Sequence, residues 1–252
     1  MPMIDLNGQY ALVTGGSRGI GRAIAIALAA SGAEVAVNYF RNKQSAVEVQ
    51  EAIQQAGGRA HILKGNVASE ENVHEMFDCL MGLFPKLDIL VSNAASGILK
   101  PAMELTQHHW DWTMNINAAS LIHIIQHASP LLRPGARVIA VSSLGAIRAI
   151  PNYIAVGASK AALESMVRHL ALELGPRGIH VNCVSAGTVE TDALRHFPNR
   201  EDILAESRER TPSGRLTEPV DVANAVLFLA SPLASQIHGH TLIVDGGYSI
   251  VA

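Results

Sequence analysis

Cysteine is scarce in this chain of 252 residues, which contains only Cys79 and Cys183. The two lie far apart, and neither has a second cysteine or a histidine at metal-ligand spacing. The sequence therefore predicts neither a disulfide nor a zinc site. We expect two small apolar side chains in a reducing compartment, and no metal.

Long apolar runs are also absent. The longest candidate, residues 23–30, ends at Ser31-Gly32, well short of the roughly 20 residues that a membrane-spanning helix needs. Residues 1–10 lack the basic start and the apolar run of a signal peptide. The net charge of -3 argues against a nucleic-acid or anionic-membrane partner, because such a surface repels phosphates. We expect a cytoplasmic protein.

The chain is rich in apolar strand patterns that alternate with helical ones. Continuous apolar strands between helices are typical of a parallel sheet that is covered on both faces. We therefore predict an α/β fold, with a single Rossmann-type doubly wound sheet spanning residues 1–252. The predicted strands are 10–13, 34–37, 61–63, 87–91, 137–141 and 180–184. The predicted helices are 20–30, 45–56, one that follows the cap residue Ser69, and a long one that ends near Gly175-Pro176.

One segment, residues 188–215, does not fit this alternation. It is polar, contains Pro198 and Pro212, and mixes acidic with basic side chains. Two interpretations stay open. The segment is either a solvated helical excursion or a lid over substrate, since ligands of such sheets lie beyond the carboxyl ends of the strands.

A glycine-rich stretch follows the first predicted strand and opens the first predicted helix. Glycines at this place let the backbone approach a pyrophosphate, whose charge meets the free N–H groups of the helix. The position between strand and helix predicts a dinucleotide site. Its candidate residues are Gly15, Ser17, Arg18, Gly19, Ile20 and Gly21.

The end of the second strand indicates which dinucleotide is bound. A carboxylate there would accept the ribose 2′-hydroxyl of NAD, but this chain has Asn38 followed by Tyr39. Arg18 and Arg41 are placed to pair with a 2′-phosphate, although both could be ordinary surface charges. We predict NADPH, with Asn38, Tyr39 and Arg41 beside its ribose.

Motifs along the whole chain resemble those of the short-chain dehydrogenase/reductase family. They are Thr14-Gly-x3-Gly-x-Gly21, Asn93-Ala-Ala95, Asn117, Ser143, Lys160 with a nearby tyrosine, and Asp245-Gly-Gly247. The resemblance implies a Rossmann domain, usually in a homotetramer. It also implies that a tyrosine donates a proton, the serine steadies the substrate oxygen, and the lysine binds the nicotinamide ribose and lowers the tyrosine pKa.

Further cofactor contacts follow from position and from this resemblance. Asn66 and Val67 come after the third strand and could border the adenine, or Asn66 could simply be a turn residue. The resemblance adds loops after the later strands, near the nicotinamide. Its residues are Asn93, Ala94, Ala95, Gly187, Thr188 and Val189, besides Lys160.

The tyrosine spacing departs from the family pattern. Val156 stands four residues before Lys160, and the nearest tyrosine is Tyr153, seven residues before it. On a helix, seven steps bring two side chains to within roughly 20° of the same face and about 10.5 Å apart along the axis. Tyr153 is therefore predicted to point into the same cleft as Lys160.

This wider spacing resembles that of enoyl-acyl-carrier-protein reductases. Residues 93–97, 110–117, 142–145 and 196–202 are similar to the NADPH-dependent type III enoyl reductases of fatty-acid synthesis. The resemblance implies reduction of trans-2-enoyl thioesters carried by acyl-carrier protein. The candidate catalytic residues are Tyr153, Lys160, Ser143 and Asn117, with Ser142 as a substitute for Ser143.

Other functions remain open at this point. Ser143 and Asn117 also suit a 3-oxoacyl-carrier-protein reductase or a general carbonyl or hydroxysteroid reductase, although Val156 has no proton to donate. A third reading is a silent NADP(H)-binding protein. Asn117 either supports Lys160 through water or pins the backbone of the fourth helix.

Two partners are expected. Acyl-carrier protein is acidic, so docking calls for basic residues beside the cleft. The candidates are Lys100, Arg195, Arg200 and Arg208. The second partner is a further copy of the chain, because the resemblance implies a homo-oligomer, namely a tetramer.

Overall fold

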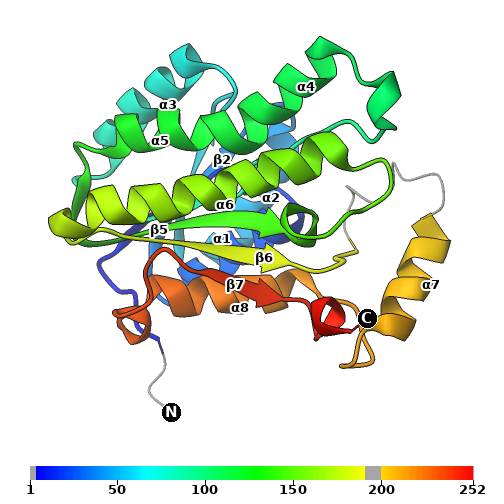
Figure 1. Ribbon diagram of the computed structural model, residues 1–252. Helices are drawn as coiled ribbons and strands as arrows, with labels where there is room; N and C mark the ends of the chain where they lie inside the picture. Colours follow the sequence, from blue (N-terminus) through cyan, green and yellow to red (C-terminus); the bar gives the residue numbers. More distant parts are fainter. Residues whose placement is uncertain (1–3, 191–199, 252) are drawn as a thin grey trace.

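A parallel sheet forms the centre of the protein, whose computed structural model describes residues 4–190 and 200–251. Its seven strands run in the order β3-β2-β1-β4-β5-β6-β7, and every neighbouring pair is parallel (Figure 1). The strands are β1 (Tyr10–Val13), β2 (Glu34–Tyr39), β3 (Arg59–Lys64), β4 (Leu87–Ser92), β5 (Leu132–Ser143), β6 (His180–Ala186) and β7 (Thr241–Val244). The predicted fold class is confirmed.

Helices cover both faces of this sheet (Figure 1). One face carries α1 (Gly19–Ala30), α2 (Lys43–Gln55) and α8 (Pro219–Ala230), and the other carries α3 (Glu70–Leu83), α5 (Ser120–Ala128) and α6 (Ile154–Leu174). The helix α4 (Gln107–Met114) leads into α5 through a π-helical stretch, η2 (Asn115–Ala119). Shorter 3₁₀ segments include η1 (Ala102–Glu104), η3 (Leu144–Ala146) and η7 (Tyr248–Ile250), and α7 (Arg200–Arg210) lies apart from the sheet layers.

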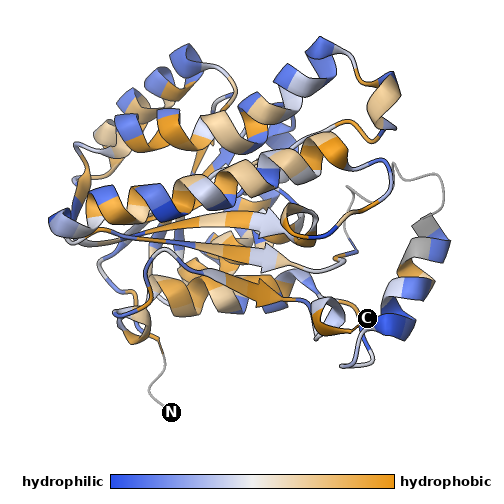
Figure 2. Cartoon of the chain, in the orientation of Figure 1, coloured by the Kyte–Doolittle hydropathy of each residue, from blue (hydrophilic) through white to orange (hydrophobic). Residues whose placement is uncertain are grey.

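The strands are apolar throughout because each one separates two cores. Leu12 packs in the core under α3, α5 and α6, whereas its neighbours Ala11 and Val13 pack in the core under α1, α2 and α8. Successive strand residues point to opposite faces, so a strand that is buried on both sides needs an apolar residue at every position. Orange apolar stripes on the inner sides of the helices match these two cores (Figure 2).

Most predicted strands and helices agree with the observed elements to within about two residues at each end, and the larger differences concern β5, α6 and β7. β5 begins at Leu132, before Pro134 and Gly135, and α6 begins only at Ile154. The strand β7 was not predicted, because its four residues form a partly exposed edge with Ile243 open to solvent.

The segment 188–215 is described only in part. Residues 191–199, which include Arg195 and Pro198, lie outside the described residues. The rest contains α7, and the Thr188 hydroxyl lies 3.0 Å from the Ser207 hydroxyl of that helix. The helical excursion is thus observed, and a lid function stays a prediction.

No described helix combines the length and the apolar composition needed to cross a membrane.

Candidate active site

The predicted site residues gather at the carboxyl edge of the sheet. Strand order reverses between β1 and β4, and in open α/β sheets ligands bind in the crevice at such a switch point. The glycine loop follows β1, and Asn93 follows β4 directly. The other predicted loops follow or end β2, β3, β5 and β6, so one edge holds all of them.

Thr14 holds the glycine loop to the end of β4. Its buried hydroxyl accepts the N–H groups of Asn93 and Ala94 at 3.0 and 3.1 Å and donates to the Val91 carbonyl at 3.3 Å. The Asn93 amide donates back to the carbonyls of Thr14 and Gly15 at 2.9 and 3.1 Å. Asn93 therefore holds the loop in shape. The sequence analysis treated Asn93 only as a cofactor contact.

Asn38 braces the same loop from β2. Its side-chain oxygen accepts the Gly15 N–H at 3.1 Å, and its amide nitrogen donates to the carbonyls of Leu63 and Gly65 at 3.3 and 3.1 Å. The side chain is buried, so both donors and acceptors are needed here. An aspartate could not donate to those carbonyls. The structure thus gives a reason for asparagine rather than aspartate at position 38. The predicted contact of Asn38 with the cofactor stays a prediction.

Two glycines of this loop stand where a side chain would collide. Gly15 has φ +61° and packs against the Ala94 backbone, so a Cβ there would lie 2.9 Å from Ala94 Cα. A Cβ on Gly21 would overlap the Gly15 carbonyl and the Asn93 amide. Both positions therefore require glycine for close helix–strand packing, as the sequence pattern indicates.

The N-terminus of α1 is open for an anion. Its N-cap residue, Arg18, makes no side-chain cap, and its first turn holds no acidic residue. By contrast, Asn42 caps α2, Ser69 caps α3 and Thr106 caps α4. Free N–H groups and the helix dipole favour a phosphate at this place. The residues present therefore fit the pyrophosphate of a nicotinamide dinucleotide.

The two predicted phosphate-binding arginines are both exposed, and neither forms an ion pair with a described carboxylate. The Arg41 guanidinium lies 5.4 Å from the Phe40 ring centroid and 5.9 Å from that of Trp112. Stacking on aromatic faces leaves the in-plane N–H groups of a guanidinium available for hydrogen bonds. Arg18 and Arg41 are thus free to bind a phosphate.

The remaining residues predicted near the ribose or the adenine are partly or fully buried. Tyr39 and Val67 are buried, and the Asn66 side chain accepts the N–H of Ala68 at 3.2 Å. That bond is the turn role that the sequence left as an alternative for Asn66. A contact of Tyr39 with the ribose, and of Asn66 and Val67 with the adenine, stays a prediction.

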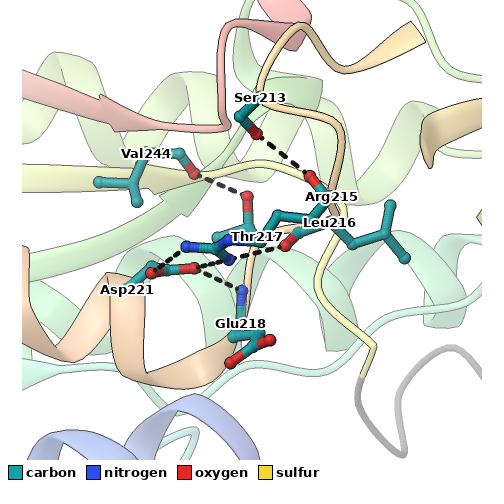
Figure 3. Close-up of polar contacts among 7 residues, drawn as sticks. All are labelled: Ser213, Arg215, Leu216, Thr217, Glu218, Asp221 and Val244. Atoms are coloured by element: carbon teal, nitrogen blue, oxygen red, sulfur yellow. Dashed lines mark hydrogen bonds and ion pairs between the residues drawn. The ribbon is translucent and has the colours of Figure 1, made fainter. Parts of the chain in front are cut away.

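Gly187 occupies a narrow gap beside the end of β7. A Cβ there would lie 2.9 Å from Asp245 Cα and 3.0 Å from the Thr217 hydroxyl oxygen. Thr217 donates to the Val244 carbonyl at 3.3 Å (Figure 3). Val189, two residues after Gly187, forms a parallel β-bridge with Thr217. The loop of Gly187, Thr188 and Val189 therefore packs against Thr217 and the residue that follows β7.

The chain after α7 is anchored by one ion pair. The Arg215 guanidinium donates to both carboxylate oxygens of Asp221, at 2.6 and 2.8 Å, and to the Leu216 carbonyl at 3.0 Å (Figure 3). Asp221 also accepts the Glu218 N–H at 2.9 Å, which caps α8. This anchor lowers the pKa of Asp221, chiefly through the hydrogen bond from Arg215.

Tyr153 is the residue immediately before α6. The helical estimate assumed that Tyr153 lies within the helix, and this is wrong: its φ and ψ are -109° and 8°, and α6 starts at Ile154. The preceding residue, Asn152, has φ 61°, a left-handed conformation that asparagine tolerates better than most residues. This turn delivers the Tyr153 hydroxyl to 3.4 Å from the Ser143 hydroxyl. Tyr153 therefore reaches Ser143 by a backbone route that differs from the predicted helix.

Val156 closes the place where the family pattern puts its tyrosine. It is buried within α6, and a Cβ on Gly97 would overlap its Cγ2 atom. Gly97 thus packs directly against Val156. The hydroxyl available beside Ser143 is that of Tyr153.

Gly145 makes room for the displaced tyrosine. A Cβ at this position would overlap Cε1 and Cδ1 of the Tyr153 ring and would lie 3.4 Å from the Ser143 hydroxyl oxygen. Sequence reasoning quoted Gly145 within a motif but gave it no role. No sequence signal indicates this role, because Tyr153 stands eight residues after Gly145 and an irregular turn brings the two together.

Tyr153 is a protonated donor at neutral pH. Burial raises the pKa of Tyr153 above its ordinary value, and the hydrogen bond with Ser143 partly offsets this rise. The phenol can therefore donate a hydrogen bond at neutral pH.

Lys160 is buried and donates to the Val141 carbonyl at 2.7 Å. Val141 and Ser143 are two residues apart on β5, or about 6.6 Å along a strand. Lys160 and Tyr153 thus reach the same end of β5. Burial lowers the pKa of Lys160 to about 8, and nearby Cys183 and Glu164 oppose this shift.

Asn117 joins three elements through its side chain. Its oxygen accepts the Ser96 N–H at 2.9 Å, in the loop after β4, and its nitrogen donates to the Ser159 hydroxyl on α6 at 3.0 Å. It lies in the π-helical stretch η2, and such stretches are common at functional sites. Water-mediated support of Lys160 stays a prediction.

Ser142 has a separate partner. Its hydroxyl donates to the buried Glu164 carboxylate at 2.6 Å. Ser143, and not Ser142, is therefore the serine beside Tyr153.

A cavity of ≈ 350 Å³ opens beside Tyr153, between η1, η3 and the start of α6. Gly145, Asn152, Tyr153 and Gly157 line it. A larger hollow of ≈ 620 Å³ lies between α1, the end of α7 and the start of α8, and Tyr153 is not among its lining residues. The smaller cavity is the candidate substrate site.

The lowered pKa of Lys160 predicts a pH limit on cofactor binding. A pKa of about 8 leaves the ammonium charged at neutral pH and neutral above that value. We expect the affinity of the free protein for NADPH, measured by fluorescence titration, to weaken as pH rises through about 8. A Lys160→Met variant should bind weakly at every pH without this inflection, and an unchanged inflection in the variant would assign the titration elsewhere.

Comparison with known proteins identifies the family of this chain. The family model described as Enoyl-(Acyl carrier protein) reductase matches residues 15–249, nearly the whole chain. The chain therefore belongs to this family, within the short-chain dehydrogenase/reductases, and it is an oxidoreductase.

Individual relatives match over almost their full lengths. The chain is 39% identical over 246 residues to 1-cyclohexenylcarbonyl-CoA reductase of Streptomyces collinus, covering 97% of this chain and 88% of the relative. It is 37% identical over 255 residues to a hydroxynaphthalene reductase-like protein of Metarhizium majus (strain ARSEF 297), covering 96% of each. A short-chain dehydrogenase from Burkholderia cenocepacia J2315, solved in complex with NADP, is 37% identical with a TM-score of 0.90, covering 97% of this chain and 99% of the other.

Proposed function

We propose that this oxidoreductase uses NADPH to reduce the carbon–carbon double bond of trans-2-enoyl thioesters, as an enoyl reductase of fatty-acid synthesis. One observation carries the proposal. The hydroxyl beside Ser143 comes from Tyr153, while Val156 and Gly97 close the place of the usual family tyrosine.

The displaced hydroxyl suits a conjugated thioester. Reduction at the β-carbon builds negative charge on the thioester oxygen, which is two atoms further from the reacting carbon than a ketone oxygen would be. Tyr153 donates a hydrogen bond to that oxygen and stabilises the enolate. Its raised pKa keeps the donor protonated at neutral pH. The name of the Streptomyces collinus relative, which is that of a reductase of an unsaturated carbonyl-CoA, supports this substrate class.

Lys160 holds a ribose hydroxyl of the cofactor and places a positive charge near the tyrosine. A nicotinamide dinucleotide supplies the hydride when bound. Lys160 keeps one N–H on the Val141 carbonyl, which fixes the direction of the other two. Its positive charge stabilises the phenolate and therefore favours release of the Tyr153 proton.

The choice of NADPH rests on Arg18 and Arg41, both free to meet a 2′-phosphate. We expect Arg18→Ala and Arg41→Ala each to raise the KM for NADPH about tenfold or more, because a charged hydrogen bond contributes about 1.5–3 kcal/mol. The KM for NADH should stay unchanged in both. Arg177→Ala is the control, because Arg177 contacts Ser129 far from the loop. Equal effects on both cofactors would argue against a 2′-phosphate contact.

The proposal is tested by NADPH oxidation with a trans-2-enoyl thioester and with a 3-oxoacyl thioester of the same chain length. We expect turnover with the enoyl substrate and little with the oxo substrate. The opposite preference would overturn the proposal. Product analysis by mass spectrometry confirms that two hydrogens have been added across the double bond.

A second candidate is ketone reduction. The 3.4 Å approach of the Ser143 and Tyr153 hydroxyls also suits a carbonyl oxygen held between them. The hydroxynaphthalene reductase-like relative favours this class as well. Turnover of the 3-oxoacyl thioester alone would establish it.

A further inference from the structure

The cavity beside Tyr153 carries positive charge that the reduction does not use. Lys100 and Arg148 line it. None of its described lining residues is an aspartate or a glutamate. An anionic part of a substrate would therefore find attraction and no opposing carboxylate here.

Neither cation is neutralised within residues 4–190 and 200–251, where no carboxylate forms an ion pair with Lys100 or Arg148. Arg148 donates through Nη2 to the Ser249 carbonyl in η7. That single bond orients the guanidinium and leaves its other N–H groups available. A guanidinium held in this way is suited to a phosphate, which accepts two parallel hydrogen bonds.

The start of α6 adds to the same field. Ile154 and Gly157, in its first turn, line the cavity. No side chain caps this helix, and its first turn contains no acidic residue. The positive end of the helix dipole thus faces the same space as the two cations.

The wall of the cavity is apolar as well as basic. Ile150 and Ile154 line it, and they are 39% and 49% exposed. An apolar wall with a cationic rim matches a molecule that combines an apolar segment with a phosphate. A thioester substrate has this chemistry, since its acyl chain continues into a pantetheine arm that ends in a phosphate.

We propose that Lys100 and Arg148 bind the phosphate of the pantetheine arm, whether coenzyme A or acyl-carrier protein supplies it. This inference rests on the proposed thioester reduction. The acyl group lies beside Tyr153, and the arm leaves through the mouth of the cavity between the two cations. The rim therefore determines specificity for the carrier, while Tyr153 determines the reaction.

Arg208, another basic candidate, is not among the residues that line this cavity. Arg208 lines the larger hollow beside α1 and α8, together with Glu190 and Glu218. Arg195 lies outside the described residues, as does the side chain of Arg200. Of the two candidates whose side chains the structure describes, Lys100 lines the Tyr153 cavity and Arg208 does not, and the sequence analysis missed Arg148.

The test uses one enoyl group on three carriers: coenzyme A, acyl-carrier protein, and N-acetylcysteamine, which keeps the thioester but has no phosphate. We expect Lys100→Ala and Arg148→Ala each to raise the KM about tenfold or more for the phosphate-bearing carriers that the rim accepts. Kinetics with the N-acetylcysteamine thioester should not change. Arg133→Ala, an exposed cation at the opposite edge of the sheet, is the control.

The outcomes separate the possibilities. An effect on the coenzyme A thioester alone assigns the rim to coenzyme A, and an effect on the protein-bound thioester alone assigns it to acyl-carrier protein. Equal losses with all three carriers, or no loss with any, overturn the phosphate site. Failure of the wild-type protein to reduce the enoyl group on any of the three carriers overturns the proposed function instead. Lys100→Ala keeps the test independent of the Arg148–Ser249 contact.

Discussion

Replacement of Tyr153 by phenylalanine should reduce kcat by about 100-fold or more, because a positioned proton donor contributes about 10²–10⁴ to rate. The ring would still pack against Gly145, so only the hydroxyl beside Ser143 is removed. NADPH affinity should remain, since Tyr153 lies at the substrate cavity. The measurement is steady-state reduction of an enoyl thioester together with a fluorescence titration of NADPH.

A matched control is Tyr10→Phe. Tyr10 packs on Phe84 at 4.9 Å between ring centroids, at the start of β1 and away from the cavity. This variant should keep wild-type kinetics. If Tyr153→Phe retained most of the wild-type kcat, the shifted tyrosine would not be the proton donor.

The second large effect is expected from Gly145→Ala. The new methyl group would overlap the Tyr153 ring and press toward the Ser143 hydroxyl, which forces the phenol away from its position. A misplacement of about 1 Å can reduce the rate about 100-fold. We expect kcat to fall on this scale while the NADPH dissociation constant and the circular dichroism spectrum remain unchanged.

Gly82→Ala controls for the glycine substitution itself. Gly82 lies in α3, and a Cβ there meets nothing within 4 Å. Alanine at this place should stabilise the helix by about 0.5–1 kcal/mol without changing kcat. A Gly145→Ala variant with wild-type kcat would show that Tyr153 can shift without loss, and it would weaken the assignment of the tyrosine.

The sheet could be predicted from sequence because its strands are buried on both faces. The run Tyr10–Val13 is apolar and is followed at once by glycines, so both the strand and the dinucleotide loop were visible. β7 was not predicted, although Leu242-Ile243-Val244 is an apolar run; the strand has only four residues, and none of them is fully buried. The ends of β5 and α6 depend on Pro134-Gly135 and on the turn at Asn152, which local patterns describe poorly.

The site could be predicted in its residues but not in its contacts. The spacing of Tyr153 and Lys160 was evident, yet the helical estimate assumed a regular backbone where Asn152 is left-handed. The roles of Gly145 and Gly97 arise from atoms of Tyr153 and Val156 that approach across a turn. Asn38 was interpreted through the cofactor, whereas its amide satisfies three backbone groups that only the folded sheet brings together.

The bracing of the glycine loop has a thermodynamic consequence. Thr14, Asn38 and Asn93 hold the loop through hydrogen bonds that exist without a ligand. The conformational entropy of ordering this backbone is thus lost during folding, and little of it remains to be lost when a dinucleotide arrives. A preorganised loop of this kind gives up less affinity to ordering, so weakening one of its three braces should appear in calorimetry as a larger entropic penalty on binding.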